Sequence, residues 1–140
     1  MNEVNGRDDK IIDLNKLSSK IIGAAIRVHR ELGPGLLESV YQACMLIELK
    51  KMNLKANEEV PIPVIYRGQK VKEEGFRIDI LVEDQIVVEL KSVEKIQPVF
   101  HKTLLTYLRL AKKQLGLLIN FNEILLKDGI SRVINSPEKS

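Results

Sequence analysis

Apolar residues at helical spacing predict two helices in the first third of the chain. Ser18 can act as the N-cap of the first, and Gly33 followed by Pro34 is typical of its end. The apolar stripe of this helix is expected at Ile21, Ala25, Val28 and Leu32. The second helix is expected over residues 36–52, with a buried stripe of Leu37, Val40, Cys44 and Ile47 beside a row of Glu38, Tyr41 and Met45.

The middle of the chain changes to a β pattern. Residues 60–66 are β-rich, but Pro61 and Pro63 cannot donate ladder hydrogen bonds, so this strand is expected at a sheet edge. Residues 67–69 form a turn. Residues 75–82 and 85–93 then predict two strands joined by a tight turn at Glu83 and Asp84.

A helix and a further strand follow. Residues 98–113 predict a helix, and the unbroken apolar run at 115–121 is typical of a strand covered on both faces. Residues 124–134 are expected to add a short edge strand. The predicted fold is therefore α/β, with a mixed central sheet flanked by helices.

Length and composition favour one domain. The chain has 140 residues, 44% of them hydrophobic, which suits a single core over residues 17–135 between a polar lead-in (1–16) and a polar tail (136–140). No apolar run approaches the roughly 20 residues of a membrane span, and the start lacks a signal-peptide pattern. With Cys44 as the single cysteine, expected as a buried apolar filler, this predicts a cytoplasmic protein.

The strongest chemical signal lies in the predicted hairpin at residues 75–93. Side chains alternate along a strand, so Arg77, Asp79 and Leu81 share one face and Ile78, Ile80 and Val82 share the other. A tight turn places residues opposite each other when their numbers sum to about 168. Asp79 then faces Glu89, with Lys91 and Arg77 beside them.

Two apposed carboxylates repel unless a cation lies between them. Their hard oxygen atoms suit Mg²⁺ or Mn²⁺, and a neighbouring lysine can orient an attacking water or stabilise developing phosphate charge. The alternative is a solvated strand face with cross-strand ion pairs. The nearly apolar run 86–91, with charge appearing only at Glu89 and Lys91, favours an interior strand that carries a site at its end.

Several segments resemble the GxxExxY protein family. Gly35, Glu38 and Tyr41 match the G-x-x-E-x-x-Y signature, and residues 25–34, 60–62, 77–79, 89–91 and 115–121 also resemble this family. The resemblance spans about residues 18–134. The family is grouped with the PD-(D/E)XK nuclease-like superfamily, which implies an α-β-β-β-α-β core with an extra N-terminal helix in this chain.

The resemblance also implies roles. Asp79 and Glu89 become metal ligands, Lys91 the catalytic lysine, and Glu38 a helix-borne acid that holds a second metal or tunes the first. Relatives often carry Gln four residues before the tyrosine of the late helix. Here Thr103 precedes Tyr107, so either this arm of the site is weakened or His101 or Lys102 serves nearby.

Some of these residues have structural explanations. Glu38 in the first turn of a helix favours the helix dipole, and Tyr41 can be a core residue with its hydroxyl at the edge. His29 lacks a second His or a Cys at zinc spacing. The dipole also explains Arg109, Lys112 and Lys113 at the end of the late helix without a bound nucleic acid.

The sequence supports three hypotheses about function. The leading hypothesis is a metal-dependent nuclease acting on nucleic acid. The second is a non-catalytic module on the same fold that binds nucleic acid or a partner protein, since a net charge of +3 leaves little to grip a duplex. The third is an ordinary interaction domain. The edge strand at 60–66 also makes a homodimer an expectation.

Overall fold

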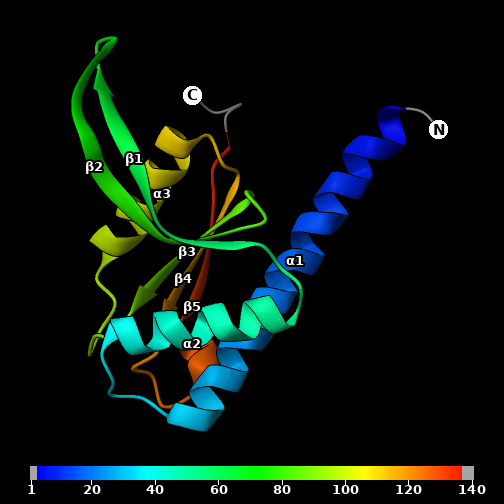
Figure 1. Cartoon of the computed structure of the whole chain (residues 1–140), viewed down its shortest axis with the longest axis vertical. Coiled ribbons are helices and arrows are strands. Elements are labelled where there is room, and N and C mark those ends of the chain that lie inside the picture. The colour runs from blue at the N-terminus through cyan, green and yellow to red at the C-terminus, as the bar shows by residue number, and fades with distance from the viewer. Residues whose placement is uncertain (1–2, 137–140) are drawn as a thin grey trace.

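The structure is a computed structural model that describes the backbone of residues 3–136 and the side chains of residues 14–72 and 75–136. Two long helices come first, then three strands, a helix, and two more strands (Figure 1). In chain order the elements are α1 (Glu3–Leu32), α2 (Glu38–Lys51), β1 (Ala56–Tyr66), β2 (Gln69–Val82), β3 (Ile86–Lys91), α3 (Pro98–Ala111), β4 (Leu115–Asn120), the 3₁₀ helix η1 (Leu126–Gly129) and β5 (Ile130–Ile134).

The strands form one mixed sheet in the order β1-β2-β3-β4-β5. Only β3 and β4 are parallel, and α3 connects them, as the predicted βαβ unit requires. The predicted core order α-β-β-β-α-β is confirmed from α2 to β4. β1 lies at a sheet edge, as its two prolines predicted, and β5 supplies the opposite edge.

Helices cover both faces of the sheet. One core cluster joins α1 and α2 to Ile80, Val88 and Leu117, and the other joins α3 to Val87 and Leu118. In the part of the chain that the structure describes, no helix is long and apolar enough to cross a membrane. The two apolar layers explain why β3 and β4 carry almost no polar side chains before their last residues.

The first helix starts much earlier than predicted. It begins at Glu3, so Ser18 is an interior residue and not an N-cap, and residues 3–16 are helical. Ser18 is fully buried, and its hydroxyl donates to the carbonyl of Asn15 and accepts from Arg132 on β5. A serine bonded in this way can lie within a helix. The predicted end at Leu32 is confirmed, although Leu32 itself is exposed.

The predicted buried face of the second helix is wrong. Leu37, Val40 and Ile47 are exposed and Cys44 is half-buried. The buried residues are instead Tyr41, Met45, Leu46 and Leu49. This helix has apolar residues around most of its circumference, so spacing alone could not determine which side meets the sheet.

Tyr41 determines the orientation of α2. Its ring stacks on Phe121 at 4.4 Å between centroids. Its hydroxyl donates to the carbonyl of Gly33 (2.6 Å) and accepts from the amide of Leu36 (3.2 Å). Tyr41 therefore holds the loop between α1 and α2 closed while burying its ring.

We expect Tyr41→Phe to lower the free energy of unfolding by about 1 kcal/mol, because it leaves the part-buried Gly33 carbonyl and the Leu36 amide without this partner while keeping the stacked ring. Urea denaturation measures the change. Tyr66→Phe is the matched control, since Tyr66 is exposed and should change stability by less than about 0.5 kcal/mol. Equal stability of wild type and Tyr41→Phe would contradict this role.

Candidate active site

The candidate site lies where β2 and β3 separate. The strands pair at Ile80 with Val88, Leu81 with Val87 and Val82 with Ile86, which is the predicted register. At the next position, hydrogen bonds from backbone amides to side-chain carboxylates replace the backbone pairing of the two strands. The Asp79 amide donates to Glu89 Oε1 (3.1 Å), and the Leu90 amide donates to Asp79 Oδ2 (2.8 Å). Each carboxylate thus binds the backbone of the opposite strand, and the two acids meet.

Both carboxyls hold protons unusually tightly. Burial is the main cause and raises the pKa of Glu89 to about 8, with the charge of Asp79 adding to the effect. Burial likewise raises the pKa of Asp79 to about 6, against the lowering effect of the Leu90 hydrogen bond. Glu89 is only 8% exposed, so water solvates its charge poorly. The pair is therefore a site that favours an added positive charge.

Lys91 is the last residue of β3 and lies two residues after Glu89. Its charge lowers the pKa of both Asp79 and Glu89. Its ammonium lies 4.5 Å from the centroid of the Phe100 ring on α3, a cation–π contact that helps to place it. Lys91 is half-buried, which keeps part of the side chain in contact with water.

A cavity of about 170 Å³ opens beside these residues, between the sheet and α3. Its lining consists of Glu89, Lys91, Val99, Phe100, Thr103, Leu104, Tyr107 and Leu118. Thr103 and Tyr107, the two positions that the family resemblance indicated on the late helix, both face this cavity. Burial, then the charges of Glu89 and Asp79, raise the pKa of the Tyr107 hydroxyl, so it stays protonated and can donate a hydrogen bond.

Glu38 approaches this site from the other face of the sheet. It is the first residue of α2 and exposed, and its charge raises the pKa of Asp79. The Ser92 hydroxyl donates to the Leu36 carbonyl (2.5 Å) and so attaches the loop before α2 to the end of β3. Within the described residues, however, no three His, Cys, Asp or Glu side chains are grouped as a metal site. Glu38 therefore neighbours the acid pair without completing a set of three ligands.

The other predicted residues lie farther from the cavity. Tyr41 is a core residue that closes the loop before α2, so its structural explanation is the one that fits its contacts. Arg77 is exposed on β2, two residues before Asp79. His29 Nε2 lies 2.7 Å from the carbonyl oxygen of Glu123, which gives this histidine a structural partner.

The predicted face of Ile78 on β2 is wrong, and the difference affects the neighbouring Asp79. Ile78 does not share a face with Ile80 and Val82; it packs in the α3 cluster with Leu81 and Val87. The alternation of β2 is therefore interrupted at Asp79. The interruption coincides with the point where β1 also loses its pairing, between Val60–Ile78 and Glu58–Ile80.

Glu59 occupies that interruption and is an acid that the sequence did not reveal as part of the site. Its φ of 50° is left-handed, and the Gln42 side chain donates to its carboxylate (3.0 Å). Its charge raises the pKa of both Asp79 and Glu89. Hairpin arithmetic from the turn, where Tyr66 pairs with Gln69, would have placed Ala56 opposite Asp79. The two register shifts farther along the hairpin bring Glu59 level with Asp79 instead, between the pairs Glu58–Ile80 and Val60–Ile78.

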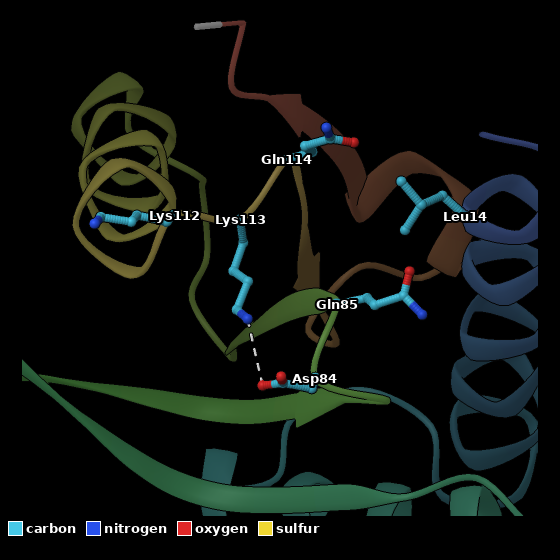
Figure 2. Close-up of a pocket in the computed structure, with 6 residues that line it drawn as sticks. All are labelled: Leu14, Asp84, Gln85, Lys112, Lys113 and Gln114. Atoms are coloured by element: carbon cyan, nitrogen blue, oxygen red, sulfur yellow. Dashed lines mark hydrogen bonds and ion pairs between the residues drawn. The ribbon is translucent and has the colours of Figure 1, made fainter. Parts of the chain in front are cut away.

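A second small cavity lies at the opposite end of β3. It has a volume of about 160 Å³ between the β2–β3 turn and the segment after α3. Its lining is Leu14, Asp84, Gln85, Lys112, Lys113 and Gln114 (Figure 2). Lys113 reaches Asp84 at 3.3 Å, while Lys112 points away. This single exposed ion pair offers no buried reactive group, so the chemistry is concentrated at the Asp79–Glu89 end.

We expect wild type without metal to lose stability as the pH rises from about 4 to about 8. Folding raises the pKa of Asp79 from 3.8 to about 6 and that of Glu89 from 4.5 to about 8, so the folded state holds more protons across this window. The loss should reach a few kcal/mol, since a one-unit change of pKa corresponds to about 1.4 kcal/mol.

Urea denaturation in EDTA at a series of pH values measures this dependence. Glu89→Gln should flatten the curve above about pH 6, because the remaining carboxyl is then largely ionised. Wild-type stability that is constant or increases between pH 4 and 8, relative to Glu89→Gln, would show that the pair does not titrate as described.

Comparison with known proteins places this geometry in a family. Neither a curated protein nor a solved structure matches the chain. The family model described as PD-(D/E)XK nuclease superfamily matches residues 15–133, which include the second half of α1, all of α2, the acid pair and the cavity wall. Since that match covers most of its length, the chain belongs to the PD-(D/E)XK nuclease superfamily.

Proposed function

We propose that this protein is a metal-dependent nuclease that hydrolyses phosphodiester bonds in nucleic acid. The observation that carries the proposal is the buried Asp79–Glu89 pair, whose mutual repulsion a divalent cation would relieve, with Lys91 next to it. Nucleases of this superfamily generally use divalent metals.

The residues present fit a hard cation. Asp79 and Glu89 would hold Mg²⁺ or Mn²⁺ through carboxylate oxygens, with Glu38 as a further acid close to Asp79. When bound, such an ion stabilises the negative charge that develops on a phosphate undergoing hydrolysis. Glu59, which acts electrostatically on both carboxyls, belongs to the same acidic cluster.

The other residues of the cavity have separate tasks in this proposal. Lys91 orients the attacking water or donates to a phosphate oxygen, and its contact with Phe100 holds the ammonium near the acids. The protonated Tyr107 hydroxyl can donate to a phosphate oxygen from α3. α3 contains no Asp or Glu, so a polyanion meets no like charge along that wall.

We further propose membership in the GxxExxY family within this superfamily. Gly35 has a φ of 94°, which favours glycine, and Tyr41 bonds both Gly33 and Leu36 in the same loop. Glu38 then starts α2 close enough to Asp79 to affect its pKa. The three signature residues thus have complementary roles: the loop conformation, the approach of an acid, and the closure that holds both.

A non-catalytic module is the second candidate. Two observations favour it: Thr103 stands where relatives often carry Gln, and no third ligand is grouped with the acid pair among the residues described. Whichever function holds, a cytoplasmic location and a homodimer formed through the edge strand stay predictions.

At a pH above neutral, we expect millimolar Mn²⁺ or Mg²⁺ to raise the melting temperature of wild type. A ligand present at about 100 times its Kd adds about 2.7 kcal/mol to the stability of the state that binds it. Asp79→Asn should lose the shift. Asp84→Asn, which changes an exposed carboxylate at the other end of the hairpin, should keep it. Equal shifts in all three proteins would place the metal elsewhere.

The nuclease proposal itself is tested by Lys91→Ala. Cleavage of DNA and RNA with Mn²⁺ should fall by at least roughly 100-fold, as when one transition-state donor is removed. Stability should change far less than activity, because Lys91 loses a partly exposed cation–π contact and an attraction to the two acids that water screens in part. Lys95→Ala, an exposed lysine four residues later, is the control.

Three results are decisive. Cleavage lost in Lys91→Ala but kept in Lys95→Ala supports the nuclease. A wild type that is inactive on every substrate while metal demonstrably binds supports the non-catalytic module. Undiminished cleavage by Lys91→Ala means that the activity arises from another site or from a contaminant.

A further inference from the structure

The outer part of the β1–β2 hairpin extends beyond the cores of the protein. We call residues 64–72 the hairpin arm. The apolar cluster on the α3 face reaches Ile62 and Phe76, and every side chain from Ile65 to Lys72 is exposed. In Figure 1 the tip of this arm is the part of the hairpin farthest from α2. Packing within the domain therefore does not account for its length.

The arm is positively charged. It contains Arg67, Lys70 and Lys72 and no Asp or Glu, and Glu73 and Glu74 follow directly after it on β2. Within the described side chains, neither lysine forms an ion pair, while Arg67 lies 5.6 Å from the centroid of the Tyr66 ring. Three cations within nine residues concentrate positive charge at the tip of the hairpin, which attracts a polyanion.

The lysines lie on both faces of the outer hairpin. Lys72 pairs with Val64 and Lys70 pairs with Ile65. Val64 and Ile65 are neighbours on β1, so their side chains and those of their partners point to opposite faces. The arm therefore presents cations on both of its faces beyond the two cores.

A built-in bend directs the arm. The β1–β2 register shifts between Ile62 and Val64 and again between Val64 and Ile65. At Gly75, a Cβ atom would lie 2.0 Å from Val64 Cγ2, so only glycine lets the two strands approach at this point. Bulges of this kind increase the local twist and re-aim the strands beyond them.

We propose that the hairpin arm grips double-stranded DNA by entering its major groove, with Lys70, Lys72 and Arg67 contacting phosphates. This inference rests on the proposed nuclease function and names the form of its substrate. The major groove of B-form DNA, about 12 Å wide, admits a two-stranded ribbon, whereas the major groove of A-form RNA is too narrow. Basic side chains at the tip then neutralise the phosphates on either side.

The test measures binding in EDTA, where no cleavage interferes. The arm variant is Arg67→Gln, Lys70→Gln, Lys72→Gln. The matched control is Lys16→Gln, Lys20→Gln, Arg30→Gln, which removes the same charge from exposed positions of α1, on the face of the sheet opposite α3. Fluorescence anisotropy with a labelled DNA duplex, between about 50 and 200 mM salt, gives the Kd and its salt dependence.

The arm variant should bind the duplex roughly tenfold or more weakly than wild type, and its log–log salt slope should fall by about one for each cation lost. The control triple should bind like wild type. Melting curves should coincide, because all six residues are exposed. Wild type should bind single-stranded DNA of the same length and an RNA duplex more weakly than it binds the DNA duplex. The arm substitutions should also weaken the binding of these two ligands less than they weaken the binding of the DNA duplex.

Other outcomes would overturn the proposal. Equal duplex binding by the arm variant and wild type would leave the exposed Ile65, Tyr66 and Val71 as a protein-binding surface instead. Equal losses for single strands and duplexes would reject the groove assignment. A wild type that binds no duplex would also reject the proposed role of the arm. The nuclease proposal is decided separately, by measuring metal-dependent cleavage of single strands.

Discussion

Everything at the candidate site depends on the exchange of hydrogen bonds between Asp79 and Glu89. Each carboxylate accepts from a backbone amide of the opposite strand, at the point where the β2–β3 ladder ends. The exchange holds the strands apart without leaving their amides unsatisfied, and it brings two acids together under burial. The raised pKa of both acids and the demand for a cation follow from it.

The rest of the fold supplies the low-polarity surroundings that raise the pKa of both acids. β3 is enclosed between the two core clusters, so the charge of Glu89 has little water to solvate it. Tyr41 and Ser92 hold the loop before α2 against the end of β3, which keeps Glu38 in electrostatic range. α3 adds the cavity wall with Thr103 and Tyr107. The acids, the lysine and the cavity thus come from four different elements.

The local irregularities of the sheet have a common location and consequence. The left-handed Glu59, the loss of β1–β2 pairing and the changed face at Ile78 all occur beside Asp79. A regular strand would send alternate side chains to fixed faces, but an interruption at this point turns Asp79 toward Glu89. A second irregularity, at Gly75, bends the hairpin arm. The same two strands therefore hold the acids at one end and present the arm at the other.

The order of the elements, the edge position of β1 and the register that opposes Asp79 and Glu89 were all predictable from the amino-acid sequence. Proline chemistry, the turn at Glu83 and Asp84 and the period of two along a strand are local properties, so they can be read from the chain. The tertiary structure alone decided which side of α2 is buried, that Ser18 lies inside α1 and bonds Arg132, and that Glu59 joins the acids. These outcomes depend on contacts between residues far apart in the chain. A helix that is apolar around most of its circumference, or a bulge that shifts a register, acquires its orientation only when the neighbouring layer packs against it.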